Sequence, residues 1–364
     1  MERRLGDRRT MDRRSMLGVM GAAGAAFAGR EGLSLPFQAG AAEGINVMEH
    51  GARGDGTHDD TDAIQRAIDA SKAGRPVVLP AARYRIRKTI VLHDETVVLG
   101  YGRHSILVCS EPGVDAVRCE AKRVFLEGLS LDGDQSNRDG LIVHDSDDVR
   151  VRRCWFKGMG GRGLVVDNAP CVIMDSTIEL CGGDGVVVRA TNSGEPVHLV
   201  SCYIYHNAGH GVHFTYNANQ GMVQANEIVL NGGSGILVET ACQMLSIMGN
   251  AILGNHQHGI EIRTDSPYNS IVSNVLSENG LSGVSLGPSA NATVLSANRL
   301  LDNCKTSGAA RGELQITQSK DTVVMGNIFA HHSGPDDRTP GILAEQGAIA
   351  HAIGNVFRGV LETG

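Results

Sequence analysis

HGVHF at residues 210–214, SGILV at 234–238 and HGIEI at 258–262 are three successive copies of one pattern, with their glycines 24 residues apart. The pattern extends in both directions, with its glycines at Gly140, Gly163, Gly185, Gly211, Gly235, Gly259, Gly283, Gly312 and Gly341. Short strands repeated at this period predict a single-stranded parallel β-helix of three-strand coils that stack about 4.8 Å apart. We expect a right-handed winding, because parallel crossovers are right-handed in nearly all proteins.

Asparagines repeat at the same period and indicate how the corners of the coils are held. Asn207, Asn231, Asn255, Asn279 and Asn303 form one series, and Asn226, Asn250, Asn274 and Asn298 form another that continues at Asn327 and Asn355. An amide has donors and an acceptor, so asparagines stacked from coil to coil can satisfy one another at the bends. A leucine-rich repeat has a similar length, but it requires a leucine framework that this sequence lacks.

The composition agrees with an all-β chain. The 364 residues include 47 glycines and 4% aromatic residues, as expected for many short strands joined by tight turns. A solenoid grows by adding coils, so this length does not require a second core. The formal net charge of −7 argues against nucleic acid and anionic membranes as partners.

The segment ahead of the repeats reads VMEHGARGDGTHDDTDAIQRAIDAS at residues 47–71 and RPVVLPAARYRI at residues 75–86. It predicts a capping α-helix at about residues 59–73, with Asp59, Asp60 and Asp62 at the helix N-terminus and apolar side chains over the first coil. The Gly-Asp-Gly turn, the helix and the strand that follows resemble the entry segment of the pectate-lyase-like superfamily. The resemblance implies a right-handed β-helix of the kind used by secreted polysaccharide-processing enzymes, with the active groove over the middle coils of one sheet.

The N-terminus predicts export. Asp12-Arg13-Arg14-Ser15-Met16-Leu17 precedes a weakly apolar stretch over residues 18–28, and this order resembles a twin-arginine signal. We expect residues 1–41 to be a signal peptide and residues 42–364 to be a β-helix in the periplasm or outside the cell. Residues 1–41 carry seven arginines and four acidic residues, so their removal would change the charge from −7 to −10.

Eight cysteines in an exported chain would ordinarily suggest disulfides. Twin-arginine cargo, however, folds in the cytosol, where thiols stay reduced. Cys154, Cys171, Cys202 and Cys242 also lie in strand-like runs, and no CxxC spacing suggests zinc. We therefore expect buried free thiols.

The first and third residues after each repeat glycine are apolar and should point inward, so the second and fourth should face outward. The fourth positions are His144, Asp167, Arg189, Thr215, Glu239, Arg263, Gly287, Thr317 and Glu345. The second positions are Ile142, Val165, Val187, His213, Leu237, Glu261, Ser285, Gln315 and Leu343. Ionisable residues gather in the middle coils, which makes this sheet the candidate site.

Residues just before the glycines lie at the rim of the same face. Asp184 and His210 fall there on adjacent coils, where we expect the carboxylate to orient the imidazole as an acid or base. The catalytic candidates are Asp184, His210, His213, Glu261 and Arg263, and the substrate-binding candidates are Asp139, Arg189, Glu239 and His258. The alternative for Asp167 with Arg189, and for Glu239 with Arg263, is that they form ordinary ion pairs between adjacent coils.

Different reactions are compatible with these residues. Glu239 and Glu261, about 8 Å apart by coil rise and strand spacing, would leave room for the water of inverting hydrolysis. Histidine and arginine could instead remove the C5 proton of a uronic acid and steady the developing charge. Gly-His-Gly at residues 209–211 resembles the polygalacturonase relatives, and Ile-Glu-Ile-Arg at 260–263 resembles alginate-epimerase-type helices. The remaining signature residues of both groups are absent.

We expect no cofactor. The loop LDGDQSNRDG at residues 131–140 gathers acidic side chains and keeps calcium open as a weaker alternative. The histidines form two groups, His206, His210 and His213 in one and His256 and His258 in the other. The groups lie two coils apart, about 9.6 Å, which is too far for them to share one metal ion. HHSGPDDRTPG at residues 331–341 predicts an exposed loop.

The sequence thus predicts an exported carbohydrate-active enzyme, a lyase, hydrolase or epimerase, that acts on a polysaccharide or oligosaccharide. The alternative is a non-catalytic β-helix that binds a glycan or acts as an accessory protein. A groove flanked by Asp184, His210 and Glu261 would favour the enzyme, and a flat, ion-paired face would favour binding.

Overall fold

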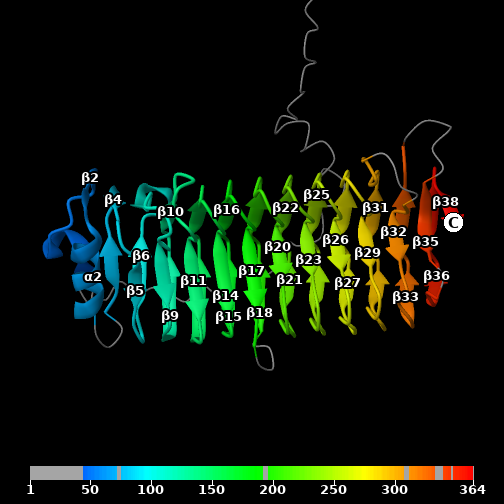
Figure 1. The fold of residues 1–364 in the computed structure, drawn as a ribbon, viewed down its shortest axis with the longest axis horizontal. Coiled ribbons are helices and arrows are strands. Elements are labelled where there is room, and N and C mark those ends of the chain that lie inside the picture. The colour runs from blue at the N-terminus through cyan, green and yellow to red at the C-terminus, as the bar shows by residue number, and fades with distance from the viewer. Residues whose placement is uncertain are drawn as a thin grey trace, which may run out of the picture. The chain divides into compact units, whose positions relative to one another are not determined.

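The computed structural model describes residues 44–71, 75–191, 196–306, 311–332, 339–345 and 347–363. These residues form three long parallel sheets that run side by side along a β-helix (Figure 1). Each coil after the first contributes one strand to each sheet, and equivalent strands of successive coils pair with one another. In the first coil, helix α2 (Thr61–Ala70) follows the second strand in place of a third. The predicted fold is confirmed. The predicted signal peptide lies outside the described residues.

Sheet A holds strands β1 (Ile45–Asn46), β3 (Val77–Leu79), β6 (Val97–Gly100), β9 (Lys122–Glu127), β12 (Asp147–Arg152), β15 (Cys171–Met174), β18 (Val197–Val200), β21 (Met222–Gln224), β24 (Ser246–Met248), β27 (Ser270–Val272), β30 (Val294–Ser296), β33 (Thr322–Met325) and β36 (Ala350–Ile353). Sheet B holds β2 (Asp55–Asp59), β4 (Ala82–Arg85), β7 (Ser105–Val108), β10 (Ser130–Asp132), β13 (Trp155–Lys157), β16 (Thr177–Glu179), β19 (Tyr203–Tyr205), β22 (Glu227–Val229), β25 (Ala251–Leu253), β28 (Val275–Ser277), β31 (Arg299–Leu301), β34 (Ile328–Ala330) and β37 (Val356–Arg358).

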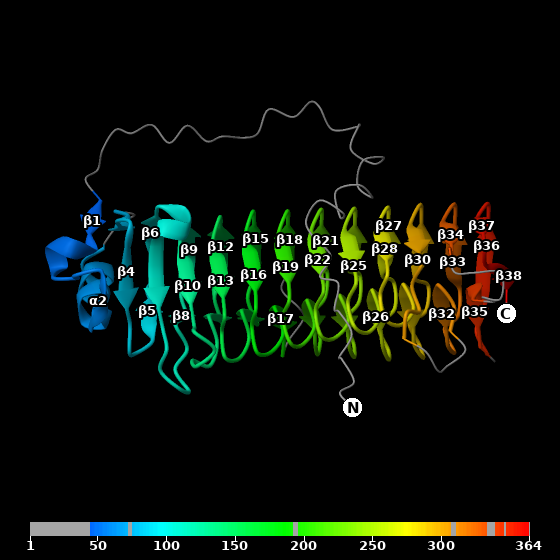
Figure 2. The ribbon, with the colours of Figure 1, turned by 90° about the horizontal axis from the view of Figure 1, so that it is seen from above.

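Sheet C carries the repeat pattern and holds β5 (Ile90–Leu92), β8 (Val117–Cys119), β11 (Leu141–His144), β14 (Leu164–Asp167), β17 (Val186–Arg189), β20 (Val212–Phe214), β23 (Ile236–Val238), β26 (Ile260–Ile262), β29 (Val284–Leu286), β32 (Leu314–Ile316), β35 (Pro340–Ala344) and β38 (Leu361–Thr363). Figure 2 shows the coils from above, evenly stacked from the N-terminal helix onward. Two 3-10 turns, η1 (Val47–His50) and η2 (Gly102–His104), complete the N-terminal coils.

Strand alternation fills the interior as predicted. Val186 and Val188 of β17 lie in the hydrophobic core, and so do the equivalent residues of the neighbouring coils. The expectation that all second positions are exposed is wrong for Val165, Val187 and Leu237. They point outward but are at most 4% exposed. The outer face of sheet C therefore has an apolar floor between its polar side chains.

Both asparagine series form ladders inside the corners. The Nδ2 of Asn207 donates to Oδ1 of Asn231 over 3.0 Å, and the same contact joins Asn231 to Asn255. Backbone N–H groups donate to the same acceptor oxygens, so each asparagine satisfies two groups of the preceding coil. The second series repeats this arrangement through Asn355. The structural role predicted for the asparagines is confirmed.

The capping helix is α2 (Thr61–Ala70), shorter than predicted. Asp59 accepts hydrogen bonds from the backbone and hydroxyl of Thr61, and so stabilises the helix start. Asp60 occupies the N-cap position, but its side chain makes no capping hydrogen bond to the helix. Its carboxylate binds the backbone N–H groups of Arg53 and Gly54 and holds the Gly-Asp-Gly turn instead.

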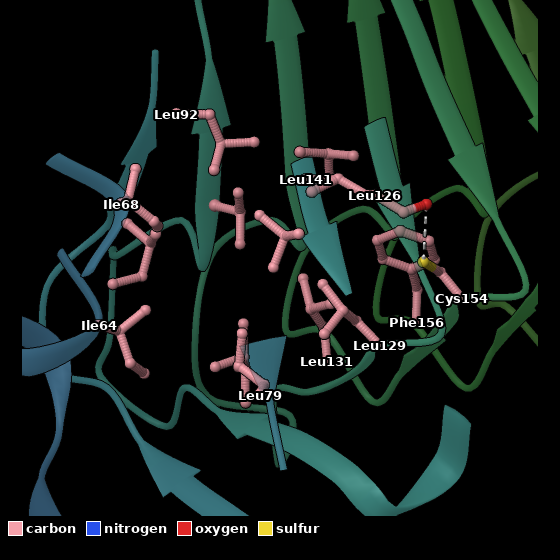
Figure 3. Close-up of a pocket in the computed structure, with 14 residues that line it drawn as sticks. Ile64, Ile68, Leu79, Leu92, Leu126, Leu129, Leu131, Leu141, Cys154 and Phe156 are labelled. Carbon is pink, nitrogen blue, oxygen red and sulfur yellow. Dashed lines mark hydrogen bonds between the residues drawn. The ribbon is translucent and has the colours of Figure 1, made fainter. Parts of the chain in front are cut away.

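Ile64 and Ile68 of α2 close the N-terminal end of the interior. They point toward Leu79 and Leu92 across a wholly apolar cavity of about 20 Å³ (Figure 3). Packing of one helix face against the first coils removes apolar surface from water and covers an end that would otherwise expose unpaired strands.

Seven of the eight cysteines are buried free thiols within the described residues, which confirms the prediction for the strand positions, and Cys304 is partly buried. Burial raises the pKa of Cys154 to about 12, so this thiol stays protonated. None of the helices in the described ranges is long and apolar enough to cross a membrane.

The predicted loop at residues 331–341 is only partly described. Residues 333–338 lie outside the described residues, whereas Pro340 and Gly341 begin strand β35. His331 is buried, and its Nδ1 lies 3.0 Å from the Glu313 carboxylate. The prediction of exposure is therefore wrong at His331, which contacts the buried Glu313 carboxylate, and at Gly341, which is buried in strand β35. It is confirmed at His332, which is exposed.

Candidate functional site

Seven side chains from four adjacent coils form a closed loop of polar contacts on the outer face of sheet C. They are Asp184, His210, His213, Ser234, Glu239, Glu261 and Arg263, and we call them the polar ring. The strands β17, β20, β23 and β26 position them, because consecutive strands pair in register. Leu237 pairs with His213 on one side and Glu261 on the other, so it lies inside the ring.

One side of the ring is built on His213. Its Nδ1 lies 2.8 Å from Oδ2 of Asp184, and its Nε2 lies 3.4 Å from Oε2 of Glu239. Within the described residues this Nε2 is buried and has no hydrogen-bond partner. An ionised Asp184 can only accept, so the proton of the imidazole is on Nδ1.

Arg263 forms the next part of the ring. Its NH1 donates to Glu239 over 3.0 Å, and its Nε donates to Glu261 over 2.9 Å. The predicted Glu239–Arg263 ion pair is confirmed, as is Asp167–Arg189 at 2.8 Å. Glu261 has a cationic partner that the sequence reasoning missed, because the contact runs along one strand rather than between coils.

Ser234 closes the ring and was not among the predicted site residues. Its hydroxyl donates to Glu261 over 2.8 Å, and its backbone N–H donates to Nδ1 of His210 over 2.9 Å. Because Nδ1 accepts, the proton of a neutral His210 is on Nε2. A serine at the rim position, one coil after His210, was the available sequence signal.

The structure corrects the predicted pairing of Asp184 with the His210 imidazole. Asp184 accepts from the backbone N–H of His210 over 2.6 Å, and its second oxygen binds the ring of His213. Asp139 binds the backbone N–H of Arg162 in the same way. Rim side chains thus bind the backbone of the next coil, which leaves one Asp184 oxygen to orient a different histidine.

Burial and hydrogen bonds set the protonation of the ring. Burial alone would raise the pKa of Asp184, but hydrogen bonds from His213 and the His210 backbone outweigh it and lower the pKa. For Glu261, hydrogen bonds from Arg263 and Ser234 likewise outweigh burial and lower the pKa. Burial lowers the pKa of His210, so this imidazole is neutral near neutral pH.

The remaining candidates lie outside the ring. The Asp139 carboxylate is 1% exposed and binds the Arg162 guanidinium. Arg189 donates to Asp167, and the two lie at the C-terminal ends of the neighbouring strands β17 and β14. His258 is buried on the Glu261 coil, and burial lowers its pKa to about 4.

Metal binding has little support in this region. Within the described residues, no three histidine, cysteine, aspartate or glutamate side chains are grouped to hold a metal ion. In the acidic loop, Asn137 binds the backbone of Gly160, and Asp139 is neutralised by Arg162. These two side chains therefore serve the turn.

Comparisons with known proteins agree with the architecture. Residues 44–113 match the family model described as rhamnogalacturonase A/epimerase, pectate lyase-like, and residues 167–303 match the right handed beta helix region model. These matches support a right-handed β-helix superfamily of pectate-lyase-like proteins. The A-module of mannuronan C-5 epimerase AlgE6 from Azotobacter vinelandii superposes with a TM-score of 0.78 at 23% identity, covering 88% of this chain and 94% of that module.

The sequence is also similar to mannuronan C5-epimerase AlgE5 of Azotobacter vinelandii, 28% identical over 225 residues. The aligned part covers 53% of this chain but 22% of that relative's length. PfbA, a surface adhesin of Streptococcus pneumoniae, superposes with a TM-score of 0.67 at 11% identity, covering 88% of this chain and 91% of PfbA. These structural likenesses establish the fold.

Proposed function

We propose that this chain acts on a polysaccharide at the polar ring and removes a proton from the sugar carbon next to a carboxyl group. Polysaccharide lyases and C5-epimerases share this step, and mannuronan C5-epimerases are among the relatives. The observation that carries the proposal is a pair of neighbouring imidazoles whose hydrogen-bond partners favour opposite tautomers. The ring centroids of His210 and His213 lie 5.2 Å apart.

His213 is the proposed base. Asp184 fixes its tautomer and orients Nε2 as the proton acceptor, a role that carboxylates play toward catalytic histidines. His210 presents Nε2–H as a donor, because its Nδ1 is occupied by the Ser234 backbone. A base and a donor thus lie side by side.

Hydrolysis by two carboxyl groups has less support. A glycosidase acid needs a raised pKa so that it holds a proton at working pH. Hydrogen bonds instead lower the pKa of Glu261, against the effect of burial. Glu261 is therefore ionised and suits the binding of a hydroxyl or a cation.

The test follows the C5–H signal of polymannuronate and other polyuronates by NMR in D₂O. Epimerisation replaces this proton with deuterium, and elimination leaves a C4=C5 double bond with no hydrogen on C5, so loss of the C5–H signal reports proton removal in both cases. We call this loss C5 exchange. We expect His213→Ala to slow exchange by about 10²–10⁴-fold, the usual contribution of a general base. His144→Ala is the matched control, because Nδ1 of His144 also lies 3.0 Å from an aspartate, Asp167, outside the ring. An undiminished rate in His213→Ala would refute the assignment.

A second candidate function is glycan binding without chemistry. Arg263, the arginine of the polar ring, donates to both Glu239 and Glu261. Its charge is therefore already paired and is not free to bind the carboxylate of a uronic acid. Saturable oligosaccharide binding by the wild type, with no exchange on any polyuronate tested, would support this function and exclude the first.

We also propose that the chain is exported to the periplasm or beyond by its twin-arginine-type signal. The paired arginines Arg13 and Arg14 and the weakly apolar stretch after them support this proposal. A reporter fused after residue 41 should be exported by the wild-type segment and retained when both arginines are changed to lysine. Equal export of both fusions would exclude this route.

A further inference from the structure

A second group of chemistry-bearing side chains lies on the outer face of sheet B, away from the polar ring. It comprises Arg103, Trp155, Lys157, Glu179, Tyr203 and Tyr205, and we call it the aromatic patch. Lys157, Glu179 and Tyr205 are register partners on the successive strands β13, β16 and β19. Thr177 separates Trp155 from Tyr203 in the neighbouring column.

The rings of the patch present flat apolar surface beside cations. Tyr203 and Tyr205 stack with their centroids 4.2 Å apart and their planes at 28°. The Arg103 guanidinium lies 3.5 Å from the centroid of Trp155, and Lys157 Nζ lies 5.9 Å from the same centroid. These cation–π contacts hold both cations at the surface and leave their charge uncompensated by a carboxylate.

The charge of the patch differs from that of sheet C. On sheet C, Arg162, Arg189 and Arg263 all form ion pairs. Among the described residues, neither Arg103 nor Lys157 has a carboxylate at ion-pair distance; their close contacts are with Trp155. The cations of this patch are therefore available to an external anion.

Glu179 can offset at most one of the two positive charges of Arg103 and Lys157. Its side chain lies between Lys157 and Tyr205 and is only 5% exposed. Burial raises the pKa of Glu179, and the nearby Lys157 and Arg103 reduce this shift without reversing it. Among the six patch residues the two cations therefore outnumber the single carboxylate. Asp132, the register partner of Lys157 on β10, lies 3.9 Å from the Arg83 guanidinium.

We propose that the aromatic patch binds an acidic oligosaccharide. Sugar C–H faces pack on the tyrosine rings, and carboxylates pair with Arg103 and Lys157. The patch and the polar ring lie on different sheets, so binding at the patch does not depend on the proposed reaction.

Calorimetric titration of the full chain with an oligomannuronate and with a neutral oligosaccharide of equal length tests the charge requirement. We expect the wild type to bind the acidic probe more tightly and to lose affinity as salt screens the cations. Arg103→Ala with Lys157→Ala should weaken binding of the acidic probe about tenfold or more. Equal affinity for the two probes, or no binding of the acidic one, would overturn the proposal.

The matched control removes the same charge from sheet A. Arg150→Ala with Arg152→Ala changes two cations that pair with Asp148 and Asp175, and it should leave the affinity unchanged. An equal loss in this control would show a non-specific charge effect and contradict a defined site.

Aromatic contact is tested separately. Tyr205→Ala should weaken binding, whereas Tyr205→Phe retains the ring and should bind like the wild type. If both variants bind like the wild type, the tyrosine surface is not the site.

The patch variants should retain C5 exchange at saturating substrate, and His213→Ala should retain patch binding. A failure of the reaction is thereby distinguished from a failure of the patch.

Discussion

At the scale of single residues, Ser234 links the two halves of the polar ring although it carries no charge. Its side chain is fully buried, and its hydroxyl is one of the donors that keep Glu261 ionised. A group that acts through its neighbours is a positioning residue, and its removal should be visible first in the titration of Glu261.

Ser234→Ala should raise the pKa of Glu261, because the carboxylate loses a hydrogen bond while its burial is unchanged. NMR titration of the glutamate carboxyl carbon measures the change. Ser282→Ala is the control, since Ser282 occupies the same rim position two coils later and its hydroxyl lies 3.5 Å from Gln315. A Glu261 pKa identical in wild type and Ser234→Ala would remove the proposed role.

His258 makes stability depend on pH. Burial lowers its pKa from 6.5 to about 4, so between these values the unfolded chain binds a proton that the folded chain does not. Stability therefore falls as the pH drops through this window. We expect the thermal unfolding midpoint of His258→Gln to depend less on pH between pH 6.5 and 4 than the midpoint of the wild type. If the midpoints of wild type and variant fall equally with pH across this window, His258 is not the cause of the pH dependence.

At the scale of elements, the asparagine ladders join coils whose strands are only three or four residues long in the middle of the helix. Asn255 accepts from the backbone and side chain of Asn231, and it donates to Ile228. All these groups are buried, so water cannot replace a lost partner.

Asn255→Ala should lower the free energy of unfolding by about 3 kcal/mol, because it leaves two buried donors without an acceptor. Asn355→Ala is the matched control: it receives the same two bonds from Asn327 but is only partly buried, and it should cost less. Denaturant unfolding measures both. An equal loss of unfolding free energy in the two variants would show that burial does not determine how much each asparagine stabilises the coil stack.

At the scale of the whole molecule, a β-helix is stabilised mainly by contacts between neighbouring coils. The end covered by α2 is therefore expected to depend on the cap more than the middle coils do. Ile68 is 2% exposed and faces the interior cavity, whereas Asp62 on the same helix is exposed.

Ile68→Ala should cost about 2–5 kcal/mol locally, because it enlarges an apolar cavity. Hydrogen exchange should show faster opening of β3–β6 than of β20–β26, with Asp62→Ala close to wild type. Uniform loss of protection along all coils would show instead that the helix unfolds as a single unit.

The sequence alone determined the β-helix, its inward face, both asparagine ladders and the sheet on which ionisable residues gather. A repeat period fixes which strands are neighbours, and alternation fixes which side chains share a face. Only the tertiary structure decided that Asp184 orients His213, that Arg263 joins two glutamates and that Val187 and Leu237 are buried. Several groups lie within reach of each carboxylate on such a face, and side-chain rotamers and burial select among them. The aromatic patch also could not be predicted from the repeat alone, because Arg103 reaches Trp155 from turn η2, which belongs to an earlier coil.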